Sequence, residues 1–398
     1  MAIIGTIIVY IIMACMVAAA AASIIKPGCE LGNQFEEGIN SIGPIFLSVA
    51  GIFAAIPYIS SFIMGVFGPL FNSIGADPAM AATTIIAVDM GGYQLADVIA
   101  QTRESWIMAM YNGYMAGATV IFTVPVGLKL IDKKDHKIFA MGIMCGFLSI
   151  PIGVLVSSIV TALTNPFIRE TISTSTEATY QLAMSFGQIF INILPLVVIC
   201  VLIAVGLMVI PNIMIKGFSI FGGFMDIAAR IILVGWILEI FTGLPSKILG
   251  GWGFDPIMAD EVSLERSLEI IGYVCMMLAG AFPMVYLIQK YLSKGLGKIG
   301  KVFNLSPEAT TGILATCANS IAMFPMLKDM KNEDKVKTVA FAVCGSFVIG
   351  DHLSFMANFQ PNLIVPLFVG KLIAAACAVI LAQLIAVPKI KASKVADA

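Results

Sequence analysis

The sequence predicts an all-α protein that crosses a membrane many times. Of its 398 residues, 59% are hydrophobic and only 12% are charged, and the mean hydropathy is +0.98. Soluble domains carry about twice that charged fraction, so the composition excludes an ordinary soluble protein. The net charge of −1 and the lack of a basic patch argue against a nucleic-acid partner. The eight cysteines lack the spacing of a metal site or a disulfide framework.

Apolar runs of about 20 residues, the length that crosses a bilayer, recur along the chain. The first run has no positively charged stretch before it and is too long for a signal peptide, so we interpret it as a retained span. We expect about nine full spans, at 3–25, 42–66, 105–131, 137–162, 182–210, 217–243, 267–290, 335–359 and 361–387.

Two further segments, 78–98 and 307–330, are long enough to cross but are interrupted. The first carries Asp89 followed closely by two glycines, and the second carries Asn319 and then Pro325. Glycine weakens a helix, and proline removes one of its hydrogen bonds. Both segments also begin with a proline, which suits a first helical turn. We therefore expect two broken or re-entrant helices.

The two halves of the chain are similar to each other. Pro57 and Pro78 in the first half match Pro283 and Pro307 in the second, and the two broken segments occupy corresponding places. This pattern predicts an inverted structural repeat within one transmembrane domain. The expected parts are repeat 1 at 3–162, a linking span at 182–210, repeat 2 at 217–387 and a short basic tail at 388–398.

Lysines are concentrated in a few stretches, which the positive-inside rule places in the cytoplasm. These stretches are 129–137, 290–301, 328–337 and 389–394. Both ends of 307–330 should then be cytoplasmic, so this segment is expected to enter and return without crossing. By alternation, 78–98 should do the same from outside, and the C-terminus should be cytoplasmic. A full crossing by 307–330 would remove the inversion.

Asp89 is the first candidate for a binding site. It lies 11 residues past Pro78, which is about 16 Å along a helix and about half of the hydrocarbon core. A carboxylate there costs about 3 kcal/mol, and the negative end of the preceding half-helix favours a cation. Gly91 and Gly92 let the backbone open, and Gln94 follows in the same stretch. The alternative is a protonated or hydrogen-bonded structural aspartate.

Asp351 and His352 form a second candidate pair, deep in the expected span 335–359. Such a pair binds a cation, relays a proton or satisfies a buried polar network. Phe355, one turn further on, offers a ring to a cation, although core packing explains it equally well.

Two other pairs of polar residues are candidates. Asn319 and Ser320 sit at the second break, where they either contact a substrate or cap the freed backbone. Glu36 and Glu37 open the second span, where they either attract a cation or begin a solvated helix. We treat these two glutamates as secondary candidates.

The sequence contains no nucleophile, nucleotide-binding or metal motif. We therefore expect no enzyme, no metal and no cofactor.

Five stretches in order along the chain resemble the ethanolamine utilisation permease family, EutH. They are "NQFEEGI" (33–39), "IGADPAM" (74–80), "DMGGYQLA" (89–96), "GDHLSF" (350–355) and "VGKLIAA" (369–375). The resemblance covers nearly the whole chain. It implies a multi-pass inner-membrane protein that brings ethanolamine into the cell, and it assigns no residue roles.

Together these observations predict a secondary transporter, or a facilitator, for protonated ethanolamine. An alkylamine is a cation at pH 7, as lysine is, and the predicted site offers carboxylates and freed carbonyls. Two alternatives stay open: a channel-like facilitator of neutral ethanolamine, and a carrier of another small polar solute such as a nucleobase or amine. The expected partners are the substrate and membrane lipid, and the sequence leaves a homo-oligomer open.

Overall fold

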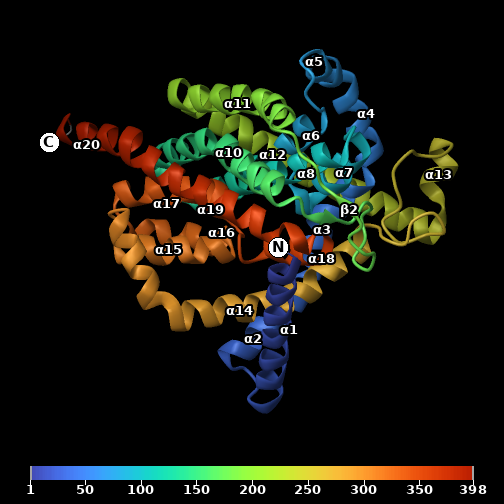
Figure 1. Ribbon diagram of the computed structural model, residues 1–398, viewed down its shortest axis with the longest axis horizontal. Helices are drawn as coiled ribbons and strands as arrows, with labels where there is room; N and C mark the ends of the chain where they lie inside the picture. Colours follow the sequence, from blue (N-terminus) through green and yellow to red (C-terminus); the bar gives the residue numbers. More distant parts are fainter. Residues whose placement is uncertain (1, 397–398) are drawn as a thin grey trace.

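The computed structural model shows a helical protein (Figure 1). It describes residues 2–396, without the side chains of residues 2, 292–299, 301–302 and 393–396. Of the predicted basic tail, residues 397 and 398 and the side chain of Lys394 lie outside the described residues, as do the side chains of Lys294, Lys298 and Lys301.

The elements alternate between long helices and short helical pieces. The first half contains α1 Ala2–Ile25, α2 Glu30–Asn40, α3 Ile42–Ala54, α4 Ile56–Val66, α5 Gly68–Ser73, α6 Ala79–Ile85, η1 Val88–Met90, α7 Gly92–Ile99, α8 Arg103–Asn112, η2 Gly113–Gly117, η3 Thr119–Thr123, α9 Val124–Leu130, η4 Lys133–Asp135 and α10 His136–Thr164. The remainder contains β1 Phe167–Ile168, β2 Tyr180–Gln181, α11 Phe186–Val209, α12 Pro211–Thr242, α13 Leu244–Leu249, α14 Ser267–Val302, α15 Pro307–Ala318, α16 Ser320–Met323, η5 Phe324–Asp329, α17 Asn332–Gly345, α18 Asp351–Phe359, η6 Pro361–Leu363, α19 Ile364–Leu381, η7 Ala382–Ala386 and α20 Val387–Ala396. β1 and β2 pair antiparallel in the loop between α10 and α11.

Seven helical stretches within residues 2–396 are long and apolar enough to cross a membrane. This confirms the predicted class, an all-α polytopic membrane protein. Six of the seven lie at predicted spans: Ile3–Ile25, Arg103–Leu130, Lys133–Thr164, Phe186–Val209, Ser267–Tyr291 and Pro361–Ala392.

Three predicted spans differ from the structure. The run at 42–66 divides at Ala55, so the long apolar stretch is instead Glu30–Ala54. The expected span 217–243 is one helix, α12, but it is not among the seven; it carries charged residues such as the ion-paired Asp226 and Arg230. The prediction of a continuous span at 335–359 is wrong, because the chain leaves helical geometry between α17 and α18.

Helix α10 lies at the centre of the packing, against α11, α17 and α19. Its glycines bring neighbouring helices close, as small residues do in membrane proteins. A Cβ on Gly146 would lie 2.2 Å from a methyl carbon of Val343 in α17. A Cβ on Gly370 in α19 would lie 2.0 Å from the hydroxyl oxygen of Ser157 in α10. Helices α10, α17 and α19 therefore form the tightly packed part of the structure.

Both interrupted segments fold as helical hairpins with their two ends held together. In the first, α6–η1–α7, the Asp77 carboxylate accepts hydrogen bonds from the backbone N–H of Ala79 at the start and of Gln101 at the end. In the second, α15–α16–η5, the Lys337 ammonium just after the hairpin donates to the carbonyl of Asn304 just before it. The two ends of each hairpin thus lie next to each other on the same side of the structure.

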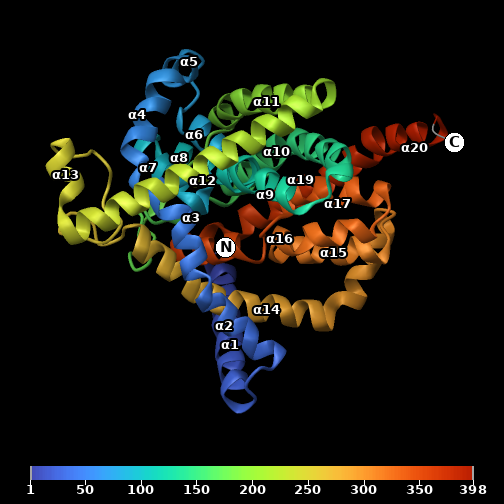
Figure 2. The ribbon, with the colours of Figure 1, turned by 180° about the vertical axis from the view of Figure 1, so that it is seen from behind.

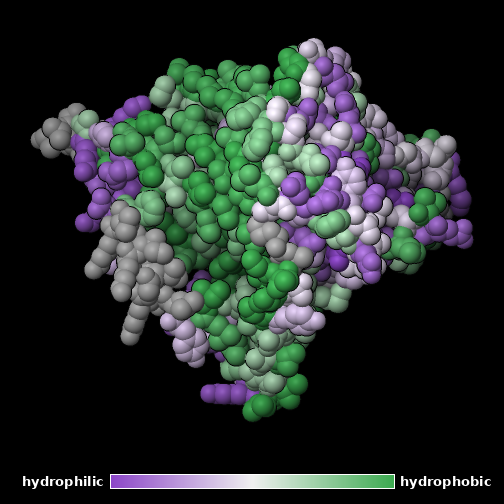
Figure 3. All heavy atoms as spheres, in the orientation of Figure 1, coloured by the Kyte–Doolittle hydropathy of each residue, from purple (hydrophilic) through white to green (hydrophobic). Residues whose placement is uncertain are grey.

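The two hairpins enter from opposite ends of the molecule. Figures 1 and 2 place α15 and α17 at one end and α6, α7 and α8 toward the other. Between these ends the surface in Figure 3 is mainly hydrophobic, with hydrophilic residues at both sides. At the end with α17, Lys335 and Asp135 form a buried ion pair at 2.8 Å. The hydrophobic belt is the expected position of the bilayer.

We predict that a membrane-impermeant thiol reagent labels the two ends of each hairpin from one side only. In a cysteine-free background, Glu308→Cys and Lys331→Cys should react from the cytoplasmic face, because both flank the second hairpin. Ser73→Cys and Gln101→Cys should react only from the opposite face. Labelling of positions 308 and 331 from different faces would show that the second hairpin crosses the membrane.

Candidate functional site

The break in the first hairpin places Asp89 in a single turn between two half-helices. Helix α6 ends before Ile86, and Asp89 lies in η1. Gly91 has φ +97°, a left-handed conformation that favours glycine. A Cβ on Gly92 would lie 2.6 Å from the carbonyl oxygens of Ile86 and Ala87. Two adjacent glycines are therefore required, the first for its dihedral angle and the second for the close approach.

The helix that packs against this break is itself widened. Between α8 and α9, the turns η2 and η3 are π-helical. Gly117 in η2 faces the break, and a Cβ there would lie 2.4 Å from the carbonyl oxygen of Ile86. π-Helical turns of this kind occur frequently at functional sites.

The second break lies at Asn319, which has an extended backbone with φ −156°. Its side-chain oxygen accepts a hydrogen bond from the backbone N–H of Ile321 at 2.8 Å, so it caps α16. Ser320 is fully buried, and its hydroxyl has no hydrogen-bond partner among the described residues. Asn319 thus performs the capping role, and its amide nitrogen is left to other contacts.

A third break, which the sequence pattern did not indicate, lies between α17 and α18. Phe347 there has φ +61°. The backbone N–H groups of Phe347 and Ile349 donate to the carbonyls of Thr316 and Cys317, at 3.1 and 3.0 Å. The turn therefore satisfies carbonyls at the end of α15. It also makes Asp351 the first residue of α18, where the positive end of the helix dipole favours a carboxylate.

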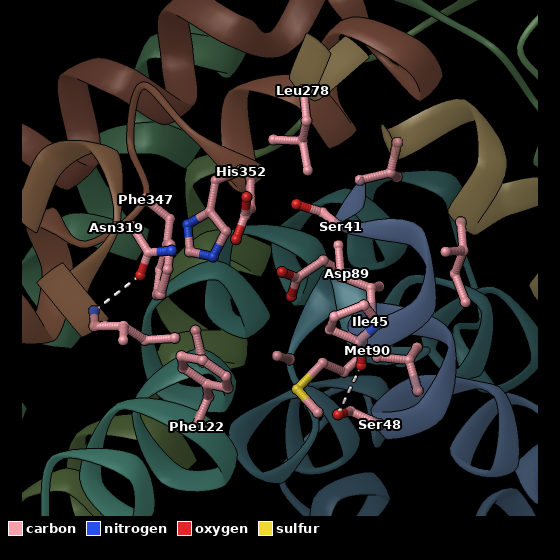
Figure 4. A pocket seen from close by; sticks show the side chains of 18 of the residues that line it. Ser41, Ile45, Ser48, Asp89, Met90, Phe122, Leu278, Asn319, Phe347 and His352 are labelled. Carbon is pink, nitrogen blue, oxygen red and sulfur yellow. Dashed lines mark hydrogen bonds between the residues drawn. The ribbon is translucent and has the colours of Figure 1, made fainter. Parts of the chain in front are cut away.

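These three breaks surround a cavity of about 330 Å³. Helices α3 and α14 complete its walls, which are mostly apolar. Figure 4 shows Asp89 and Ser41 on one side, facing Asn319, His352, Phe347 and Phe122 on the other. The polar residues that line it are Ser41, Ser48, Asp89, Asn319, Asp351 and His352. An apolar pocket with a few convergent polar groups is the usual form of a small-molecule site.

Lys371 in α19 is a residue that the sequence reasoning missed. Its side chain is fully buried; the side-chain nitrogen donates to the carbonyl of Tyr114 and lies within hydrogen-bond distance of Nδ1 of His352, each at 2.9 Å. When Lys371 is protonated its nitrogen has no lone pair, so Nδ1 accepts and the ring proton lies on Nε2. The signal was present, since Lys371 is the one charged residue in an otherwise apolar helix.

The charges around the cavity do not balance. Asp89 and Asp351 are close enough to repel each other, and Lys371 attracts Asp89. Neither carboxylate has a hydrogen bond from another side chain within the described part of the chain. Two acids against one buried amine leave an excess of negative charge when all three are ionised. Because charge is costly in a membrane interior, an excess of one sign there requires compensation.

The other predicted site residues lie elsewhere. Phe355 is buried behind the cavity, where its ring contacts Tyr93 and Tyr114. Gln94 faces a different cavity, described below. Glu36 and Glu37 are exposed on α2, just before Ser41. Of the predicted site residues, the structure thus brings Asp89, Asn319, Asp351 and His352 together at the central cavity. Phe355, Gln94, Glu36 and Glu37 do not line that cavity.

The C-terminal end of α18 is held by the long loop between α10 and α11. Arg169 donates to the carbonyls of Asn358 and Phe359 at the end of this helix. Burial lowers the pKa of the Arg169 guanidinium. Gln360 then donates to the hydroxyl of Tyr93 in the first hairpin. This network joins the two hairpin regions on the side away from the lysine-rich end.

Comparison with known proteins places this amino-acid sequence in a family. Residues 4–385 match the family model described as "Ethanolamine utilisation protein, EutH". The chain belongs to the EutH family. A "Probable ethanolamine permease EutH" from Listeria monocytogenes is 38% identical over 94% of this chain and 92% of its own length. The proteins of the same name from Escherichia coli and Salmonella typhimurium are each 35% identical, over 90% and 92% of this chain and 86% and 87% of their own lengths. No solved structure matches this EutH family member.

We predict that Lys371→Met lowers stability strongly and that Asp89→Asn offsets part of this loss. Removing one partner from a buried charged network costs about 3–5 kcal/mol. When Asp89 no longer carries a charge, less negative charge is left without compensation. A double-mutant cycle in thermal unfolding should therefore show coupling of about 1 kcal/mol or more. Strictly additive losses would show that the two charges do not interact.

Proposed function

We propose that this protein carries protonated ethanolamine across the bacterial cytoplasmic membrane through the central cavity. The observation that supports this proposal best is the pair of carboxylates, Asp89 and Asp351, at the breaks of a mostly apolar cavity. The names of the relatives, probable ethanolamine permeases, support the choice of ethanolamine as the substrate. The lysine-rich end with α17 and α20 is assigned to the cytoplasm by the positive-inside rule.

The ammonium and the hydroxyl of the substrate require different partners, and the cavity contains suitable groups for each. The ammonium donates hydrogen bonds and needs a counter-charge, which we assign to Asp89 first and Asp351 second. The hydroxyl both donates and accepts. The amide nitrogen of Asn319 and Nε2 of His352 offer donors to it, and the hydroxyl of Ser41 lies on the facing wall. Gly91 and Gly92 provide the backbone opening that puts Asp89 there.

We further propose that transport proceeds by alternating access. Two hairpins that enter from opposite ends and meet at one cavity are the arrangement expected of an inverted-repeat transporter. Movement of one bundle against the other would expose the same site to each side in turn. This part of the proposal rests on the opposed hairpins alone.

The mostly apolar walls also favour a second candidate, a channel-like facilitator of neutral ethanolamine. Residues such as Ile45, Val274 and Phe282 line much of the cavity. A neutral amino alcohol would cross such a surface at a lower desolvation cost than its cation. The two candidates differ in the protonation state that is carried.

We predict that Asp89→Asn reduces ethanolamine uptake into proteoliposomes about tenfold or more. A hydrogen bond to a charged group is worth about 1.5–3 kcal/mol, and each 1.4 kcal/mol is tenfold. Asp329→Asn, which removes an exposed carboxylate at the end of the second hairpin, is the matched control and should retain uptake. Full uptake by a correctly folded Asp89→Asn protein would contradict the proposed role.

The pH dependence of uptake separates the two candidates. Below the amine's pKa, the neutral fraction rises about tenfold for each pH unit, whereas the cation remains the main species. A cation carrier should therefore lack a tenfold rise in initial rate per pH unit between about pH 6 and pH 8 at a fixed total concentration. Rates that follow the neutral fraction in that range, and that Asp89→Asn leaves unchanged, would establish the facilitator instead.

A further inference from the structure

A second cavity, of about 260 Å³, lies on the side of the central cavity away from the lysine-rich end. Its walls come from α3, α4, α7, the loop between β1 and β2, the loop at 250–266 and the beginning of α14. None of the groups that we assign to the central site lines it. The chemistry of its walls has no place in the transport step described above.

The two cavities are stacked along three shared elements. On α3, Val49 lines the central cavity and Phe53, one turn later, lines the second. In the first hairpin, Asp89 lines the central cavity and Gln94 lines the second. On α14, Ile270 lines both. Phe53 and Ile270 are buried, so a thin apolar layer separates the two spaces.

Gln94 is the most unusual residue of the second cavity. Its side chain is 8% exposed, and neither its amide oxygen nor its amide nitrogen has a hydrogen-bond partner among the described residues. It shares one face of α7 with Asp97 and Val98, which also line the cavity. Buried amides are nearly always hydrogen-bonded, and an exception needs an explanation. A ligand in the cavity would satisfy both atoms.

Two further buried atoms without a partner belong to the same walls. The Oε2 atom of Glu265 and the Nε atom of Arg266 have none within the described part of the chain. Oε1 of Glu265 accepts from the backbone N–H of Thr174. Burial raises the pKa of the Glu265 carboxyl, although hydrogen bonds from Thr174 and Ser173 and the charge of Arg169 act to lower it. The cavity thus presents two acceptors and two donors that the protein does not use.

The second cavity is lined by more acidic than basic side chains. These are the carboxylates of Asp97, Asp255 and Glu265 and the guanidinium of Arg266. Arg266 lies 3.8 Å from Asp255 and is shared with Asp260, and Asp97 pairs with Arg103. Glu265 forms no ion pair among the described residues, and Arg169 attracts it from a longer distance. An electropositive ligand with its own donor and acceptor is the complement of this surface.

We infer that the second cavity is an outer binding site for a small hydroxylated ammonium ion. The ammonium lies against Oε2 of Glu265 and the amide oxygen of Gln94. The hydroxyl accepts from Nε of Arg266. The apolar layer of Phe53 and Ile270 is the gate between this outer site and the central cavity. The choice of ligand rests on the proposed function, while the site itself rests on residues that the central site does not use.

Binding stoichiometry tests this inference. Radiolabelled ethanolamine is equilibrated with the purified full-length protein, and bound equivalents per chain are counted. We expect two for the unmodified protein and one for Gln94→Leu and for Glu265→Gln. Glu261→Gln, which removes an exposed carboxylate from the same loop, is the matched control and should keep two. Thermal unfolding curves establish that each variant is folded.

Uptake kinetics provide the second readout. Loss of an outer capture site should raise the KM for uptake about tenfold in Gln94→Leu and Glu265→Gln, with a nearly unchanged maximal rate. Asp89→Asn should instead lose the central equivalent and the transport itself. Stoichiometry and KM that both outer variants leave unchanged would overturn the outer site and spare the proposed function. No saturable binding by the unmodified protein would overturn both.

Discussion

The need to satisfy every backbone polar group inside a membrane constrains this structure more than any other factor. A chain that leaves helical geometry in a hydrocarbon region exposes N–H and C=O groups, each worth several kcal/mol if unpaired. Here three breaks and one widened helix are placed where they satisfy one another. The turn after α17 donates to carbonyls at the end of α15, and Lys371 donates to the carbonyl of Tyr114 in a π-helical turn. The cavity exists because these groups meet at one place.

The same constraint explains why charged residues accompany the breaks. A lone carboxylate in a membrane interior is destabilising, but here Lys371 partly compensates one of the two, Asp89. When protonated, Lys371 also fixes the tautomer of His352, whose ring lies between Tyr114 and Phe347 at centroid distances of 4.8 and 5.3 Å. Under the proposed function, the substrate's ammonium would supply the remaining positive charge. The empty and loaded sites would then differ mainly in electrostatics, and the helices need not refold.

Some of these features follow from sequence and others do not. Asp89 followed by adjacent glycines in an apolar segment predicts a break, because each residue there opposes a continuous helix on local grounds. The break at 346–350 is different. Its residues, "SFVIG", are mostly apolar, and Phe347 adopts a left-handed conformation only because α15 provides partners for the backbone. A tertiary hydrogen bond determines that geometry, so periodicity predicts a span there and fails.

Lys371 and Gln94 illustrate an intermediate case. Both stand out in the sequence as polar residues in apolar surroundings, but the sequence does not reveal which space each one faces. Gln94 lies only five residues after Asp89, and we expected it to share the same site. Because α7 turns its 94, 97 and 98 face toward the 250–266 loop, Gln94 contacts the second cavity instead. Local sequence thus indicates that a residue has a role, while the packing of distant elements decides which role.

The stacking of two cavities along α3, α14 and the first hairpin bears on how a gate would work. Phe53 packs against Gly91, whose Cβ position lies 3.3 Å from the Phe53 ring. Gly91, whose left-handed conformation opens the backbone at Asp89, therefore also packs against Phe53 of the apolar layer between the two cavities. A shift of the hairpin that changes the position of Asp89 must also move Phe53, because cores packed to this density transmit strain. Under the proposed function, occupation of the central site and opening toward the outer cavity are then coupled by one contact, between Phe53 and the glycine whose dihedral angle opens the backbone at Asp89.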